Sequence, residues 1–379
     1  SAEAGTRTPT AVRPLDPEPS ASTSSATSAI PKKRIAKQTD ITYTKVFQRS
    51  SYILFLRKGD CLAMRIFMGI DNLNRNMRNP ALTIGNFDGV HLGHKALFKR
   101  VKEWAKKLDG ESVVMTFNPH PLQVFRPQDA PAFITMHEQK LALIESCGID
   151  AVIVVPFNRE FAEISATDFV KKIIVEKIGA KAIIVGYDYR FGRNREGNIE
   201  FLKAMGEKEG FSIDVVSGVH TDGVVVSSTM IRHFIHDGFI KEAGDLLGRP
   251  YEILGEVVPG RARGGRLLGF PTANVRLSIQ ASPKPGVYAV EVELEGKKYM
   301  GAANLGYNPT FGDVDLSLEV FILDFDGDIY GKQILVRFVE RLRDEVKFSG
   351  IEELIAQIQK DVERTREILT ERSVAVGAQ

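Results

Sequence analysis

The chain of 379 residues is long enough for two ordinary domains and an additional segment. Hydrophobic residues make up 43% and charged residues 26%, as in globular proteins, and the net charge of +2 gives no electrostatic reason to expect a nucleic-acid partner or a membrane surface. Two isolated cysteines and the lack of a long apolar run argue against a disulfide framework and a membrane-spanning helix, so a reducing, cytoplasmic setting is expected.

The first segment, residues 1–63, differs from the rest of the chain. Residues 1–31 are rich in Ser, Thr, Ala and Pro, which predicts disorder because too little apolar surface is present to offset chain entropy. The basic run PKKRIAK follows. Two interpretations remain open, a hydroxyl-rich, basic targeting segment or an extension upstream of the natural start. The second is favoured because globular patterning begins at Met64 with MRIFMGIDNL.

Between Met64 and Leu247, short β-branched runs alternate with longer amphipathic stretches. Strands are predicted in the runs ALTIGNF, SVVMTF, AVIVVPF, AIIVGYDYRFG and FSIDVVSGV, with helices between them. Such alternation predicts an α/β domain over residues 64–247, with a parallel sheet and helices on both faces. Ligands of such sheets bind at the carboxyl ends of the strands.

After Gly248 the pattern changes to short, often alternating runs separated by Gly, Pro, Asn and Asp. These runs predict an all-β domain over residues 248–372, a small closed barrel. One amphipathic helix is predicted at its end, over residues 350–371. The sequence does not define an oligomeric state and leaves self-association open.

The first candidate site is the strand-to-helix segment TIGNFDGVHLGH, which ends at His94. Gly85, Gly89 and Gly93 permit tight turning and close approach of the backbone to a ligand. His91 and His94 stand at the predicted helix start, where free N–H groups and the helix dipole favour a phosphate. Their imidazoles can donate hydrogen bonds to phosphate oxygens during an in-line displacement. An isolated HxxH is more often a capping pair or a metal site, but the glycine-rich turn favours phosphate chemistry.

Three further stretches fall after predicted strands and carry polar groups. Two are NPHPLQVFRP and VGYDYRFGRNREGN, and the third, VVSSTMIR, precedes a predicted helix. In the third, Ser228 and Thr229 can cap the helix and offer N–H and hydroxyl groups to an anion. Arg232, one turn further on, supplies a forked cation for phosphate. Taken alone, SSTMIR would be an ordinary helix start with a surface arginine.

The second candidate site is the stretch GEVVPGRARGGRLLGFPTANV. Its glycines and arginines form a loop that suits a polyphosphate, although it is not a Walker loop: Gly260, Gly264, Gly265, Gly269, Arg261, Arg263 and Arg266. Thr272 and Asn274 follow, and their oxygens are hard donors suited to a Mg²⁺ that keeps waters and phosphate ligands. Taken alone, the string PTAN is usually a turn.

Glu319 lies in a predicted strand between apolar residues. Two orientations are open. If its side chain faces the barrel interior, it is a carboxylate in a dry site and a candidate general base toward an alcohol. If the strand alternates the other way, Glu319 faces outward.

Together these motifs, in this order, resemble the prokaryotic bifunctional riboflavin kinase/FAD synthetase family. GNFDGVHLGH, NPHP and SSTMIR are similar to its FMN adenylyltransferase module, a branch of the HxGH nucleotidyltransferases, and residues 248–372 resemble its riboflavin kinase module, a six-stranded barrel. The resemblance implies riboflavin and ATP as substrates, FMN and FAD as products, and Mg²⁺ as cofactor. The chain departs from the pattern at Asp188, where family modules often have Asn.

The resemblance also implies roles for individual residues. His91, His94 and Glu319 would be catalytic, with Glu319 as the base of the kinase, and Thr272 and Asn274 would hold Mg²⁺ and ATP phosphates. The remaining site residues divide into those expected to bind flavin (Asn118, His120 and Pro121) and those expected to bind ATP or phosphate (Gly85, Phe87, Gly93, Asp188, Ser228, Thr229, Arg232, Gly260, Arg261, Gly265 and Gly269). The alternatives are a monofunctional HxGH nucleotidyltransferase with an inactive or flavin-binding barrel, and a flavin-storage or regulatory protein.

Overall fold

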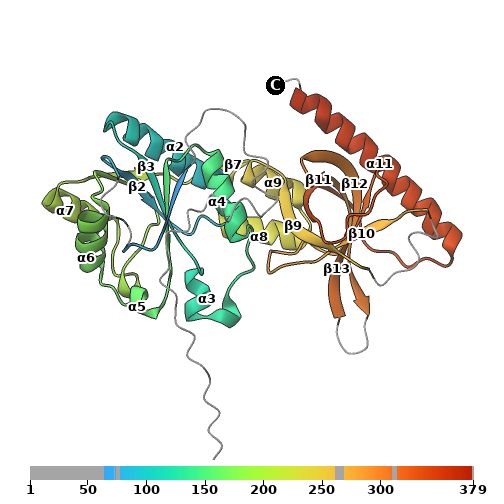
Figure 1. Cartoon of the computed structure of the whole chain (residues 1–379), viewed down its shortest axis with the longest axis horizontal. Helices are drawn as coiled ribbons and strands as arrows, with labels where there is room; N and C mark the ends of the chain where they lie inside the picture. Colours follow the sequence, from blue (N-terminus) through green and yellow to red (C-terminus); the bar gives the residue numbers. More distant parts are fainter. Residues whose placement is uncertain (1–63, 72, 74–76, 261–268, 310–313, 378–379) are drawn as a thin grey trace, which may run out of the picture. The chain divides into compact units, whose positions relative to one another are not determined.

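The computed structural model describes residues 64–377 apart from 72, 74–76, 261–268 and 310–313 (Figure 1). The predictions made for residues 1–63 therefore lie outside the described part of the chain, as do those for five residues of the polyphosphate loop: Arg261, Arg263, Gly264, Gly265 and Arg266. Within the described part, no helix is both long and apolar enough to cross a membrane.

A parallel sheet forms the centre of the first half of the chain, as predicted (Figure 1). Its strand order is β1-β4-β3-β2-β5-β6, and every neighbouring pair is parallel. The strands are β1 (Arg65–Met68), β2 (Ala81–Ile84), β3 (Ser112–Phe117), β4 (Ala151–Val155), β5 (Ala182–Gly186) and β6 (Ser212–Val216). The edge strand β1 was not predicted, because its short run carries no alternation that would identify it.

Helices cover both faces of this sheet. The side chains of β4 show this, because successive residues pack into different cores. Ile153 packs into a core with η3 and α7, whereas Val152 and Val154 pack into a different core with α2 and α4. Residues two apart along a strand face the same side, so the two cores lie on opposite faces. The longer helices of this half are α2 (Leu92–Lys107), α4 (His137–Ser146), the π-helix η3 (Phe169–Ile178), α7 (Ile199–Glu209), α8 (Ser228–Asp237) and α9 (Ile240–Leu247).

Short elements connect these strands and helices. They comprise the helices α3 (Pro121–Phe125), α5 (Arg159–Ala162) and α6 (Ala166–Asp168), the 3₁₀ turns η2 (Pro127–Asp129) and η4 (Arg193–Arg195), and the hairpin β7 (His220–Thr221) with β8 (Val224–Val225).

The second half of the chain is a closed six-stranded antiparallel barrel followed by a helix, as predicted (Figure 1). The strands follow one another around the barrel in the order β10-β13-β12-β11-β14-β9. They are β9 (Tyr251–Val258), β10 (Thr272–Val275), β11 (Gly286–Leu294), β12 (Lys297–Pro309), β13 (Val314–Ile322) and β14 (Gln333–Arg343). Side chains such as Val290, Leu305 and Val336 fill the interior. The helix α11 (Ile351–Gly377) packs against β11, β12 and β14.

Candidate active sites

The loop between β2 and α2 adopts a backbone that few sequences tolerate. Gly89 has a φ of 86°, and the non-glycine residues Phe87 and Val90 also have positive φ, at 52° and 41°. Positive φ is unfavourable for a β-branched residue such as Val90, and it persists only where the surroundings impose it. Here the Phe87 and Val90 side chains are both buried in the core below α2. The loop is thus held in one conformation by its own apolar residues.

Asp88 is the polar anchor of the same loop. Its carboxylate accepts the backbone N–H groups of Ile134 and Thr135 at 3.1 Å, and the Arg232 guanidinium donates to it at 2.6 Å. The side chains of Asp88 and Arg232 are 6% and 19% exposed. A buried carboxylate is tolerated only when it is paired and hydrogen-bonded, and this one is both. The network ties the loop to the segment before α4 and to α8.

His91 and His94 lie together at the start of α2. His91 is the N-cap of the helix, and its Nδ1 accepts the backbone N–H of His94 at 3.3 Å. The two imidazole rings are stacked, with centroids 3.5 Å apart, and the Phe87 ring is nearly perpendicular to that of His94, with centroids 5.2 Å apart. Gly93 lies in the first turn, against the His91 ring. The structure therefore brings the predicted pair together, with one ring also capping the helix.

Burial determines the charge of both histidines. It lowers the pKa of His91 to about 4, and the nearby Arg249 and Arg232 guanidiniums act in the same direction while Asp88 opposes them. Burial also lowers the pKa of His94 well below its ordinary value, assisted by His91 and Lys140. Both rings are therefore neutral near pH 7. Because His91 Nδ1 is an acceptor, its neutral ring carries the proton on Nε2.

A cavity of about 200 Å³ opens beside this loop, at the carboxyl ends of β2 and β3. Asn118 and His120 line it, as expected of residues that follow β3, and Pro121 begins α3 next to them. His120 caps α3 by accepting the N–H of Leu122 on its Nδ1 at 3.2 Å. Burial lowers the pKa of His120 to about 4, so this ring is neutral as well.

Two residues that the sequence did not single out also line this cavity. His137 and Lys140 come from the first turn of α4. Both ring nitrogens of His137 are buried without a hydrogen-bond partner. The sequence predicted only a helix between the runs SVVMTF and AVIVVPF, and a helical pattern does not say which polar residue faces the strand ends. The sequence therefore held no specific signal for either residue.

The segment SSTMIR starts α8, but the residue that caps the helix is not one of the two that were predicted to do so. The N-cap is Ser227, whose hydroxyl accepts the N–H of Met230 at 3.2 Å, and not Ser228 or Thr229. Ser228 instead donates its hydroxyl to the backbone oxygen of Asp88 at 2.9 Å. Ser227 takes the cap because its backbone is extended and helical geometry begins only at the next residue.

The outer residues of α8 and the residues after β5 complete the first site. Thr229 is exposed in the first turn of α8. Arg232 is not a free cation, because its Nη2 and Nε donate to Asp88 and to the Ala132 oxygen. Asp188 is exposed just after β5, the strand that pairs with β2, so it stands at the same edge of the sheet as Gly85. The described lining of the cavity does not include Asp188.

In the barrel, the predicted residues of the second site lie on adjacent strands. Asn274 of β10 is directly opposite Glu319 of β13, and Thr272 Oγ1 is 3.5 Å from Glu319 Oε2. Leu318 and Val320, the neighbours of Glu319, belong to the barrel core. Alternation then places Glu319 on the outer face of the strand. The interior orientation considered above is therefore wrong, and Glu319 is half-buried beside Thr272.

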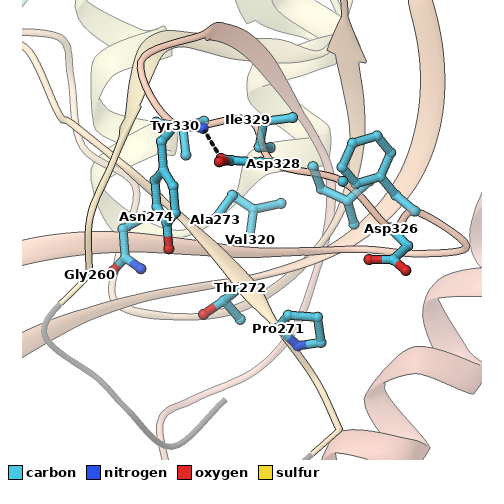
Figure 2. A pocket seen from close by; sticks show the side chains of 14 residues that line it. Gly260, Pro271, Thr272, Ala273, Asn274, Val320, Asp326, Asp328, Ile329 and Tyr330 are labelled. Atoms are coloured by element: carbon cyan, nitrogen blue, oxygen red, sulfur yellow. Dashed lines mark hydrogen bonds between the residues drawn. The ribbon is translucent and has the colours of Figure 1, made fainter. Parts of the chain in front are cut away.

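A second cavity, of about 500 Å³, lies next to these residues (Figure 2). Thr272 and Asn274 line it together with Tyr330 and Gly260, whereas its described lining does not include Glu319. The backbone of Gly260 packs so tightly on the Asn274 amide that a Cβ at this position would collide with it. Gly269 lies at the far end of the loop with a φ of 82°, a conformation that suits glycine.

The oxygen donors of the second site fit a magnesium–nucleotide complex. Among the residues that the structure describes, no group of three His, Cys, Asp or Glu side chains could hold a metal by itself. Thr272, Asn274 and Glu319 instead present a hydroxyl, an amide oxygen and a carboxylate on one face. Mg²⁺ often takes few protein ligands and completes its shell with water and phosphate. The donor set is therefore suitable for Mg²⁺ bound with ATP.

A parallel sheet with an HxGH loop, followed by a closed barrel with a Thr-Asn-Glu face, defines a two-domain transferase of the nucleotidyltransferase and kinase class. The family model described as FAD synthetase matches residues 73–230, and that described as riboflavin kinase matches residues 247–369. The chain belongs to the family of bifunctional riboflavin kinase/FMN adenylyltransferases.

Individual relatives agree with this assignment. The chain is 42% identical to a bifunctional riboflavin kinase/FMN adenylyltransferase from Escherichia coli K12, over 80% of this chain and 97% of the relative. It is 38% identical to a protein of the same name from Haemophilus influenzae, over 80% of this chain and 98% of the relative. A crystal structure titled as a macrolide-efflux protein from Streptococcus pneumoniae shares 34% identity and a TM-score of 0.73, covering 80% of this chain and 99% of that one.

Proposed function

We propose that the chain phosphorylates riboflavin to FMN at the Thr272–Asn274–Glu319 site and adenylylates FMN to FAD at the His91–His94 site. The observation that carries the proposal is the presence of two chemically distinct constellations in one chain. One is a stacked pair of neutral imidazoles at a helix start, and the other is a set of oxygen donors on adjacent strands. Family membership and the relatives named above support both activities.

In the kinase step, Glu319 is the general base. Its carboxylate accepts the proton of the ribityl 5′-hydroxyl as that oxygen bonds to the γ-phosphorus of ATP. The bond from the γ-phosphorus to its bridging oxygen breaks, and ADP leaves. The outward orientation of Glu319 makes this role accessible to a substrate, and the nearby Thr272 hydroxyl can orient the carboxylate. Phosphoryl transfer depends mainly on such positioning.

In the adenylyl step, an oxygen of the FMN phosphate bonds to the α-phosphorus of a second ATP. The bond from that phosphorus to the α–β bridging oxygen breaks, and pyrophosphate leaves. The neutral His91 ring, protonated on Nε2, donates a hydrogen bond to a phosphate oxygen, and His94 assists from the first turn of α2. No covalent intermediate is needed.

The remaining predicted contacts complete the proposal. Asn118, His120 and Pro121 border the flavin, and the start of α8 with Asp188 faces the nucleotide. Arg232, whose guanidinium is held in place by Asp88, is the proposed phosphate contact on α8. The Mg²⁺ would be held by Thr272 and Asn274, and when bound it would neutralise charge on the ATP phosphates. A reducing, cytoplasmic compartment with small-molecule partners, without nucleic acid or membrane, is the proposed setting.

Incubation of the purified chain with riboflavin, ATP and Mg²⁺, followed by chromatographic separation of the flavins, tests the proposal. FMN should appear first and FAD after it. FAD formation from supplied FMN, with no FMN formed from riboflavin, would instead favour a monofunctional nucleotidyltransferase with an inactive barrel.

A further inference from the structure

Lys140 is a buried lysine that the proposed chemistry leaves without a role. We propose that Lys140 is a positioning residue of the adenylyltransferase site, whose ammonium group ties the carboxyl ends of β2 and β3 and thereby fixes the two loops that carry the His91–His94 pair and His120. The inference rests on the proposed adenylylation of FMN.

The hydrogen bonds of Lys140 define this tie. Its Nζ donates to the backbone oxygen of Asn86 at 3.1 Å, to Thr116 Oγ1 at 3.1 Å, and to the backbone oxygen of Phe117 at 3.4 Å. The Thr116 hydroxyl also donates to the Asn86 oxygen at 3.1 Å. Asn86 begins the loop that leads to His91, and Phe117 ends β3 just before the segment that leads to His120. One side chain of α4 therefore joins both loops at their origin.

These contacts indicate that Lys140 positions the two loops and does not bind the substrate. An ammonium group has three N–H donors, and Lys140 uses all three on the protein. Although Lys140 lines the cavity, it is only 8% exposed. No donor remains for a phosphate oxygen unless one of the three bonds breaks. Lys140 therefore acts on the reaction through the two loops.

The surroundings of Lys140 show why a cation is required here. The ends of parallel strands present backbone carbonyl oxygens, and Lys140 supplies a charged donor to those of Asn86 and Phe117. The neutral Thr116 hydroxyl also donates to the Asn86 oxygen. Asp88, on the loop after β2, is the acidic group that stabilises the ammonium. His94 of α2, His120 before α3 and His137 of α4 face it as neutral rings whose pKa values its charge helps to lower.

Lys140→Met tests the inference, because methionine keeps much of the side-chain volume and removes the charge. Loops displaced by about 1 Å should cost the FMN-to-FAD reaction about 100-fold in kcat. The KM for FMN should stay within about threefold, because Lys140 does not contact the substrate. The riboflavin kinase activity of the same chain should stay within about twofold and reports on the folded barrel. Lys99→Met, at an exposed position of α2, is the matched control and should leave both activities unchanged.

Lys140→Arg tests the pH dependence of kcat, which would not change if Lys140 only stabilised the fold. Burial lowers the pKa of Lys140 to about 8, so the wild-type kcat for adenylylation should fall as pH rises through that value and the ammonium loses its proton. A guanidinium stays protonated at that pH. Lys140→Arg should therefore keep most of the activity at pH 7 and lose the decline near pH 8, while the kinase profile stays as in the wild type.

Four results would overturn the inference. They are an unchanged kcat in Lys140→Met, a raised KM for FMN with kcat preserved, equal losses in the Met and Arg variants, and loss of both activities in Lys140→Met. The second would assign Lys140 to direct binding of the FMN phosphate. A wild-type chain that forms no FAD from FMN would contradict the proposed function itself. The wild-type activity is therefore measured before the variants are compared.

Discussion

The contact between Asp88 and Arg232 allows a quantitative test of how the HxGH loop is held. Asp88→Ala removes one partner of a buried ion pair and the acceptor for the N–H groups of Ile134 and Thr135. Removing one member of a buried pair typically costs about 3–5 kcal/mol, because the other charge stays buried without its partner. At about 2–4 °C per kcal/mol for a domain of this size, the thermal midpoint of the α/β domain should fall by about 6–20 °C.

The assay is thermal unfolding of the full chain, with Asp245→Ala at an exposed position of α9 as the control. Arg232→Ala and the Asp88→Ala/Arg232→Ala double variant complete a cycle. The double variant should be less destabilised than the sum of the single variants by about 0.5–3 kcal/mol, as expected for residues in contact. A midpoint for Asp88→Ala within about 2 °C of the wild type, or strict additivity in the cycle, would refute the reasoning.

Two further variants address the chemistry. Gly260→Ala should lower riboflavin phosphorylation at least about tenfold and leave FMN adenylylation intact, because the added Cβ would displace the Asn274 amide. Gly350→Ala is the control, since a Cβ at that position meets no atom within 4 Å. Equal kinase rates in the two variants would contradict the prediction. His94→Ala should lower FAD formation from FMN by about 10²–10³-fold and leave FMN formation from riboflavin unchanged. Chromatographic separation of the flavins measures both reactions. Undiminished FAD synthesis would show that His94 has no role in the adenylyltransferase site.

The sequence predicts most of this fold because hydrophobic periodicity is local information. The runs from ALTIGNF to FSIDVVSGV identify five of the six strands of the sheet, and the alternating runs after Gly248 identify the barrel. The strand β1 was missed because it is a short edge strand that depends on its pairing with β4. Pairing between segments far apart in the chain is not encoded in the local pattern of either segment.

The candidate sites show the same division between local and long-range information. The HxGH and PTAN strings locate His94 and Thr272 because their spacing and turn chemistry are local. The partner of Arg232 lies 144 residues away in the chain, so no window around SSTMIR could reveal it. The face of Glu319 was ambiguous for a different reason. Apolar residues precede and follow it, and only packing shows which of them enter the barrel.

Glu319→Gln tests most directly the central claim, that one chain carries two separate transfer sites. The amide keeps the shape of the carboxylate but cannot accept the hydroxyl proton, so FMN formation from riboflavin should fall by about 10²–10⁴-fold. Supplied with FMN and ATP, the same variant should form FAD at the wild-type rate. Loss of FAD formation from FMN, or FMN formation at the wild-type rate, would contradict the assignment of two independent sites.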